Sequence, residues 1–154
     1  MIRKSNFLPL VIVLLICLFP AISKSQRYGL PGIRNYTHAE YNAGTQNWSV
    51  VQAENGLMYF ANNNGLVEFD GAHWKLYPTD VVIRSVCSDK DKIYIGAFNE
   101  FGFYQPDEHG NLKYHSLKQL VSKQISDFDE VWRIHKTSFG IIFQSFNAIF
   151  IYNQ

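Results

Sequence analysis

The chain has 154 residues, of which 47% are apolar and 16% aromatic, and its 14 basic residues nearly balance 13 acidic ones. This composition excludes a disordered or fibrous protein, and the length is that of one ordinary domain. The aromatic content favours an all-β protein, because aromatic and β-branched side chains pack well on a pleated sheet.

The N-terminus has the pattern of a secretory signal peptide. Arg3 and Lys4 precede an apolar run over residues 7–22, and small or polar residues follow as far as Gln26. The run has 16 residues, fewer than the roughly 20 that span a bilayer. We therefore predict a cleaved signal over residues 1–25 and an exported protein, periplasmic or extracellular, with an uncleaved anchor as the alternative.

Loss of the signal changes the charge and cysteine content. Residues 1–25 hold three of the 14 basic residues, so 11 basic residues remain against 13 acidic ones. The mature chain then has no basic surface for nucleic acid, which excludes nucleic acid as a partner of this segment. Cys17 leaves with the signal, and Cys87 has no disulfide partner within the chain. The alternating apolar residues around Cys87 predict a small buried side chain rather than a reactive thiol.

A pattern recurs three times in the rest of the chain. The three segments align without a gap at offsets of 35 and 48 residues, and they are residues 57–69, 92–104 and 140–152. An alternating strand precedes each segment, beginning at Trp48, Ile83 and Val131, and a fourth strand follows the first two segments. Periods near 40 residues with four short strands each are typical of β-propeller blades.

The repeat defines the predicted fold class: all-β, an incomplete β-propeller of about two and a half blades of four antiparallel strands. The predicted parts are an N-terminal segment (26–45), blade 1 (46–79), blade 2 (80–117), a helical or loop connector (118–129) and a truncated blade 3 (130–154). A ring normally needs 4 to 8 blades, so we expect the remaining blades in a longer chain.

Two connecting segments carry their own predictions. Gly32–Tyr36 resembles the outer strand of blade 1 and is predicted to complete the last blade, which would close the ring. In the connector, apolar residues spaced near 3.6 predict a helix of about two turns from Leu117 to Ile125, capped by Ser116.

An asparagine occupies the same position in all three repeats and predicts the turn between the second and third strands. Asn64, Asn99 and Asn147 suit such a turn because asparagine tolerates a positive φ. In the first copy Gly65 follows, and Asn-Gly favours a type I′ turn. Ligand binding beside the central channel is the alternative, and its candidate residues are Asn63, Asn64, Phe98, Asn99, Phe146 and Asn147.

Two of these candidates are aromatic. Phe98 and Phe146 precede the shared asparagine at matching turns. Packing between adjacent blades is the plain interpretation, given the general burial of phenylalanine. Stacking on a sugar ring is the alternative, because aromatic faces cover the apolar side of a carbohydrate.

The sequence offers no candidate for catalysis. The five histidines are scattered and lack metal-ligand spacing with cysteines or carboxylates, so we predict no metal site. Asp127, Asp129 and Glu130 are interpreted as a solvated connector rather than a calcium site. Phosphate-binding loops and nucleophile elbows are also missing. We therefore predict no catalytic residue, no cofactor and no enzymatic activity for this segment.

The first repeat resembles the two-component-regulator propeller repeat. The matching positions are Gly56, Met58, Tyr59, Phe60, Gly65 and Leu66. The second and third repeats keep only the hydrophobic frame, since Glu100 and Ala148 replace the turn glycine. The resemblance implies an extracytoplasmic sensor propeller of a bacterial signalling protein, with ligands that are often glycan fragments. It also implies a downstream β-sandwich, a membrane span and an output that is a histidine kinase or a DNA-binding helix-turn-helix.

The resulting functional prediction is the N-terminal part of an extracytoplasmic ligand-sensing propeller of a signal-transduction or transcription-regulatory protein. The predicted partners are a glycan or other small extracellular ligand and the remaining blades. Downstream parts would supply the membrane tether and a homodimer contact. A propeller enzyme acting on glycans and a carbohydrate-binding surface protein without signalling are the alternatives.

Overall fold

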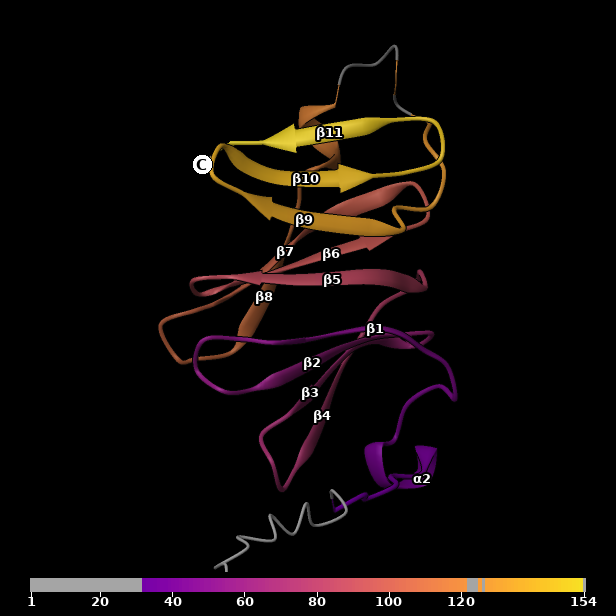
Figure 1. Cartoon of the computed structure of the whole chain (residues 1–154), viewed down its shortest axis with the longest axis vertical. Coiled ribbons are helices and arrows are strands. Elements are labelled where there is room, and N and C mark those ends of the chain that lie inside the picture. Colours follow the sequence, from indigo (N-terminus) through magenta and orange to yellow (C-terminus); the bar gives the residue numbers. More distant parts are fainter. Residues whose placement is uncertain (1–31, 122–124, 126, 154) are drawn as a thin grey trace, which may run out of the picture. The chain divides into compact units, whose positions relative to one another are not determined.

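The computed structural model describes residues 32–121, 125 and 127–153, and residues 35–154 form one compact unit, distinct from residues 1–34. The predicted signal peptide and residues 26–31 of the N-terminal segment lie outside the described residues. The second unit consists of three antiparallel sheets with almost no helix (Figure 1), which confirms the all-β prediction. None of its described helices is long and apolar enough to cross a bilayer.

Each sheet is a meander in which strand order follows the chain. The first sheet holds β1 (Asn47–Gln52), β2 (Met58–Asn62), β3 (Gly65–Phe69) and β4 (Trp74–Pro78). The second holds β5 (Ile83–Asp89), β6 (Lys92–Ala97), β7 (Glu100–Pro106) and β8 (Leu112–Ser116). The third holds β9 (Arg133–Thr137), β10 (Gly140–Gln144) and β11 (Ile149–Tyr152). The predicted units of four, four and three strands are therefore confirmed.

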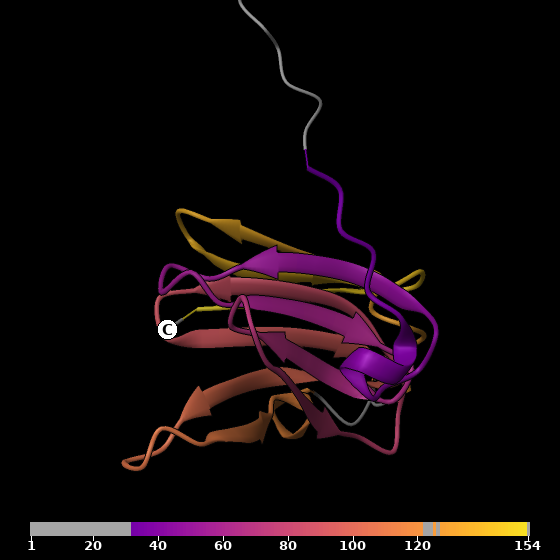
Figure 2. The same ribbon diagram turned by 90° about the horizontal axis from the view of Figure 1, so that it is seen from below.

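The first strand of each sheet lies at a common inner edge. β1 packs beside β5, and β5 packs beside β9. Figure 2 shows these inner strands on one side of the unit and the outer strand β8 on the other. The assignment of these sheets as propeller blades stays a prediction. Closure into a ring stays a prediction.

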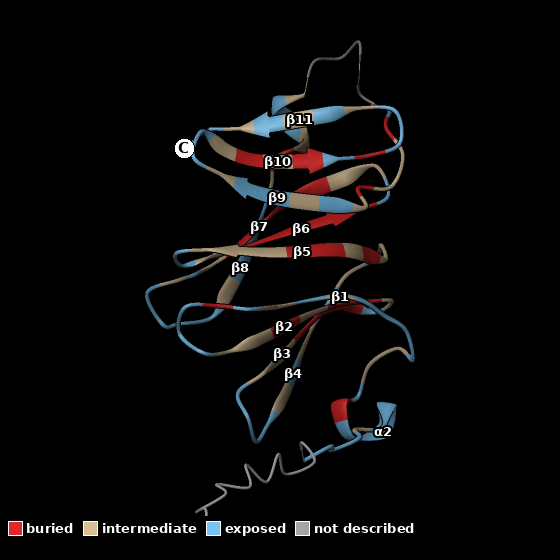
Figure 3. Ribbon diagram, in the orientation of Figure 1, coloured by how far each residue is buried: buried red, intermediate tan, exposed pale blue. Residues whose placement is uncertain are grey.

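The second sheet is buried on both faces because its side chains alternate between two cores. On β6, Ile93 and Ile95 pack into the core shared with the first sheet, and Tyr94 packs into the core shared with the third. Figure 3 shows the buried β6 and the largely exposed β11. On β11, the side chains of Ile149 and Ile151 are 67% and 56% exposed.

The half-buried Cys87 lies on β5 beside these cores. Burial raises the pKa of its thiol. A raised pKa disfavours the nucleophilic thiolate at neutral pH, which agrees with the predicted structural role.

The segment before β1 forms a short helix rather than a strand. Residues 32–37 have no strand structure, and α2 (His38–Tyr41) follows with a capping box between Thr37 and Glu40. Tyr36 contacts the rings of Phe69 and Trp74 at 5.3 and 5.1 Å between centroids. These rings cover the outer face of the first sheet, and the predicted ring-closing role of Gly32–Tyr36 stays a prediction.

The predicted positive φ at the aligned asparagines is present at Asn99 only. Asn99 has φ 51°, whereas Asn64 and Asn147 are not among the described residues with positive φ. In the first turn, the Oδ1 atom of Asn62 instead accepts a hydrogen bond from the Asn64 amide at 2.9 Å. The predicted type I′ turn is therefore wrong. Gly65 serves close packing, since a Cβ there would overlap a carbonyl oxygen of β4.

The connector contains less helix than predicted. Its described part contains the 3-10 turn η1 (Lys118–Leu120) and 3-10 structure at residue 125, and residues 122–124 of the predicted helix lie outside the described residues. The backbone becomes extended at Val121, which ends the turn. The Ser116 hydroxyl accepts a hydrogen bond from the Lys118 amide at 3.3 Å, so Ser116 does support the start of this turn.

Candidate functional site

One end of the three sheets brings together inner strands and turns from all of them. β1, β5 and β9 begin there, on the right in Figure 1, and the β2–β3, β6–β7 and β10–β11 turns lie at the same end. This end carries the exposed side chains of Trp48, Phe98 and Phe146 and the half-buried side chains of Arg84 and Trp132, and we call these five residues the aromatic rim.

Three rim residues occupy equivalent positions because the inner strands begin with the same irregularity. The register of β1 against β2 shifts between Asn47 and Ser49, and Trp48 is the extra residue. In the second sheet, Arg84 is the extra residue in the same way. In the third sheet, the backbone N–H of Trp132 donates to the carbonyl oxygen of Gln144. Gln144 is also the register partner of Arg133, the first residue of β9, so two consecutive residues face one partner. Such bulges re-aim a side chain out of the regular alternation.

The re-aimed side chains converge on one another. The Arg84 guanidinium lies over the Trp48 ring at 4.2 Å from its centroid and over the Trp132 ring at 5.1 Å. The two indoles meet edge to face, with centroids 6.0 Å apart. Cation–π contacts of this kind favour a guanidinium held between aromatic faces. Each of the three sheets therefore contributes one side chain to a single cluster.

Neighbouring polar groups fix the cluster only in part. The Trp48 Nε1 atom donates to Asn63 Oδ1 at 2.7 Å. Arg84 Nη2 lies 3.4 Å from Glu130 Oε1, with the two side chains 18% and 23% exposed. In the described part of the chain, the buried Arg84 Nε and Trp132 Nε1 atoms have no hydrogen-bond acceptor. A buried donor without an acceptor costs about 1–3 kcal/mol, and these two donors are unsatisfied in the described arrangement.

A cavity of about 330 Å³ opens beside the cluster, along the inner strands. Its described lining includes Trp48, Arg84, Trp132, Arg133 and His135, and no carboxylate. The volume lies at the lower end of the range of about 300–1,000 Å³ for small-molecule pockets. The cavity therefore has the size and the mixed aromatic and cationic lining for a small ring-shaped ligand.

The predicted ligand-binding phenylalanines lie at the rim. Phe98 is 56% exposed and Phe146 is 74% exposed, so neither is buried between the three described sheets, and packing against a further blade stays a prediction. The Phe146 ring lies 5.8 Å from the Trp132 ring, beside the cavity. Stacking of a ligand on these rings stays a prediction.

The predicted asparagines divide into two groups. Asn63 holds Trp48, and Asn64 is exposed in the same turn. Asn99 and Asn147 instead tie their turns to the connector, because their Oδ1 atoms accept hydrogen bonds from backbone amides of residues 128 and 129, each at 3.3 Å. The last two asparagines therefore have a structural role, although only Asn99 has the predicted positive φ.

Asn62 is a buried organising residue that the sequence interpretation did not identify. Its side chain is fully buried; Oδ1 accepts from the amides of Gly44 and Asn64, and Nδ2 donates to Gly44 O and Asn47 Oδ1. These bonds fix the chain just before β1 and thereby the start of the Trp48 bulge. Three consecutive asparagines signalled a turn, but nothing in the pattern distinguished the buried one.

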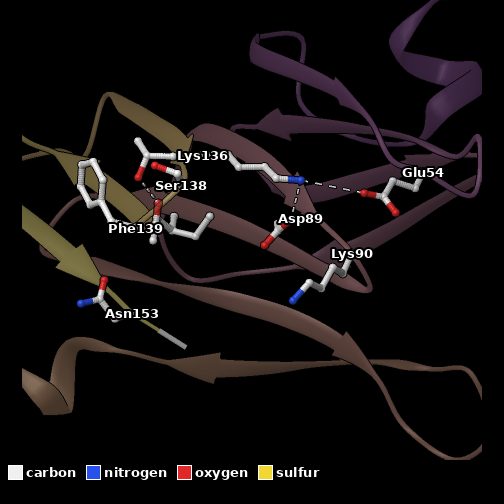
Figure 4. Close-up of a pocket in the computed structure, with 10 residues that line it drawn as sticks. Glu54, Asp89, Lys90, Lys136, Ser138, Phe139 and Asn153 are labelled. Atoms are coloured by element: carbon white, nitrogen blue, oxygen red, sulfur yellow. Dashed lines mark hydrogen bonds and ion pairs between the residues drawn. The ribbon is translucent and has the colours of Figure 1, made fainter.

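A second cavity, of about 510 Å³, lies at the opposite end of the inner strands. Figure 4 shows Lys136 between Asp89 and Glu54, with Nζ–O distances of 2.6 and 3.9 Å. These charges belong to hairpins of all three sheets and pair with one another. This end therefore holds the sheets together by ion pairs and has no indole among its described lining residues.

No family model, curated protein or solved structure matches this chain. The geometry of the rim therefore carries the functional proposal.

Proposed function

We propose that this chain is the N-terminal part of an extracytoplasmic, ligand-sensing β-propeller of a bacterial signal-transduction or transcription-regulatory protein. Its ligand is a glycan or another small extracellular molecule that binds at the aromatic rim. The role of the described segment is binding, and a separate part of the protein converts binding into an output.

The convergence of Trp48, Arg84 and Trp132 carries this proposal. Trp48 and Arg84 are the bulge residues of β1 and β5, and Trp132 directly precedes β9, where its amide donates to Gln144 O. A ligand that contacts all three depends on how the sheets are placed relative to one another. Ligands change an output only through unequal affinity for two arrangements. A site assembled from three sheets satisfies that requirement better than a site within one sheet.

The binding test uses the protein expressed from its complete gene and a panel of immobilised neutral and acidic glycans. Phe146→Ala removes an exposed ring at the rim, and Phe139→Ala is the matched control, since Phe139 is 59% exposed at the opposite end. We expect Phe146→Ala to weaken glycan binding about tenfold, in line with the apolar area of a stacked ring. Phe139→Ala should leave binding unchanged.

The outcomes separate the proposal from its competitors. Absence of binding to every glycan in the panel would overturn a glycan as the ligand, and equal effects of the two variants would overturn the rim as its binding site. Release of new reducing ends from a bound glycan would identify an enzyme instead. For the signalling role, the open reading frame downstream of residue 154 should encode a membrane span followed by a histidine kinase or a helix-turn-helix. A stop codon soon after this residue would contradict the sensor.

A further inference from the structure

We infer that the rim cavity is specific for an anionic ligand, a carboxylate carried on a ring, with Arg84 as the carboxylate-binding residue. The inference rests on the proposed function and adds the chemical class of the ligand and the residue that recognises it. It also implies that the Glu130 carboxylate competes with the carboxylate of the ligand for Arg84.

The charge around the cavity favours an anion. Arg84 and Arg133 line it from adjacent strands, together with His135, and the described lining contains no carboxylate. Glu130 reaches Arg84 from outside this lining. A neutral ligand would leave the guanidinium groups facing the cavity without new partners, whereas a carboxylate accepts hydrogen bonds from them.

The hydrogen-bond geometry of Arg84 leaves room for a second carboxylate. In the described part of the chain, its guanidinium makes one hydrogen bond, from Nη2 to Glu130 Oε1 at 3.4 Å. A well-formed charge-assisted bond between these groups is shorter, about 2.7–2.9 Å. Arg84 Nε is buried and has no acceptor. A guanidinium has five donors in a planar fork, so most of the binding capacity of Arg84 remains for a ligand.

The aromatic side chains of the rim favour a ligand that contains a ring. Trp48 is 39% exposed and Phe146 is 74% exposed, on either side of the Arg84–Trp132 contact. The Trp132 Nε1 donor is also buried without an acceptor among the described residues. A ring can rest its apolar face on these aromatic surfaces while its carboxylate meets Arg84. A uronic-acid sugar and an aromatic carboxylic acid share this chemistry.

Calorimetric titration of the full-length protein distinguishes these ligands. The probes are galacturonic-acid oligomers, neutral galactose oligomers of equal length, and benzoate with benzamide as its uncharged partner. We expect the carboxylate of the preferred pair to bind at least about tenfold more tightly than its neutral counterpart, as for a hydrogen bond to a charged group. Arg84→Gln should remove that preference.

Glu130→Gln provides a test that does not perturb the tryptophan–arginine packing. Releasing Arg84 from a weak partner should tighten carboxylate binding about two- to fivefold, because a partly exposed ion pair contributes up to about 1 kcal/mol. Glu54→Gln is the control: it removes the same charge at the opposite end, where Glu54 is 71% exposed, and should change nothing. Added salt should weaken binding of the acidic probes more than that of the neutral probes.

Each outcome decides the inference. Preference for galacturonic-acid oligomers supports an acidic sugar, and preference for benzoate supports an aromatic acid. Equal binding of neutral and acidic oligomers, with no effect of Arg84→Gln, would overturn the inference and leave the proposed glycan site standing. Weaker carboxylate binding in Glu130→Gln would also overturn it. Failure of every probe to bind would overturn both proposals.

Discussion

The contact between the second and third sheets predicts a specific effect of adding one methyl group at Gly96. This residue lies on β6 and is buried. A Cβ atom built there would lie 2.5 Å from Ser85 Oγ, 2.6 Å from Val131 Cγ1 and 2.7 Å from Val131 Cβ. Real Cβ atoms do not approach other heavy atoms so closely, so Gly96→Ala must displace Val131 or separate the sheets.

The expected cost follows from the packing around this position. Overpacking a dense core by a methyl group costs about 1–3 kcal/mol. Replacing glycine by alanine inside a strand returns about 0.5–1 kcal/mol through the unfolded chain. The net loss of unfolding free energy should be about 1–2 kcal/mol, which corresponds to a fall in Tm of about 2–8 °C for a chain of this size.

A double-mutant cycle measures whether the clash is with Val131. Val131 is fully buried, and Val131→Ala alone should cost about 2 kcal/mol through lost burial and the cavity left behind. The double variant should cost less than the sum of the single variants, because Val131→Ala removes the Cγ1 contact, whereas the contacts with Val131 Cβ and Ser85 Oγ remain. Urea unfolding followed by tryptophan fluorescence gives these free energies.

Gly32→Ala is the control for this cycle, since a Cβ at Gly32 meets nothing within 4 Å. Its effect should stay within about 0.5 kcal/mol. Additive costs in the double variant, or a Gly96→Ala variant as stable as the original, would show that the second and third sheets do not meet as described.

Two further predictions concern single residues. Asn62→Ala should lower the unfolding free energy by about 2–4 kcal/mol, because it leaves buried backbone and side-chain groups without partners; Asn63→Ala, at the adjacent half-buried position, should cost less than about 1 kcal/mol, and urea unfolding compares the two. Burial raises the pKa of Tyr104 from 10.0 to about 12, so the folded state keeps a proton that the unfolded state loses, and stability should decline as pH rises from about 10 to 12. Tyr104→Phe should flatten this decline in urea unfolding measured across that range, and an unchanged slope would assign the decline to another group.

The strands were predictable because each core imposes a period of two. On β6, alternate side chains enter different cores, and that alternation is visible as a run of apolar residues flanked by turn signals. The hairpins at Asn64, Asn99 and Asn147 were predictable for a related reason, since short polar interruptions between apolar runs mark turns. The turn conformations were not predictable, because the Asn62 side chain supplies a bond that residue preference does not include.

The Trp48–Arg84–Trp132 cluster of the aromatic rim escaped the sequence interpretation because a bulge shifts the register without changing the composition. The alternating runs begin at Trp48, Ile83 and Val131, which suggests that these three residues are equivalent. In the structure, Trp48 is equivalent to Arg84 and Trp132, one place further along in the second and third sheets. A displacement of one residue moves a side chain to the other face of a strand, so the alignment concealed the cluster.

The bulge also explains how a repeated fold can provide a site that is not itself repeated. The backbone irregularity is the same in the three sheets and directs three side chains to one place, whereas the side chains themselves differ. An arginine at all three positions would concentrate like charges, and a tryptophan at all three would lack a group to bind an anion. With Arg84 between Trp48 and Trp132, the aromatic faces stabilise the cation by cation–π contact. In the proposed site, the repeat therefore determines the position of the side chains, and the residue types determine which ligand can bind.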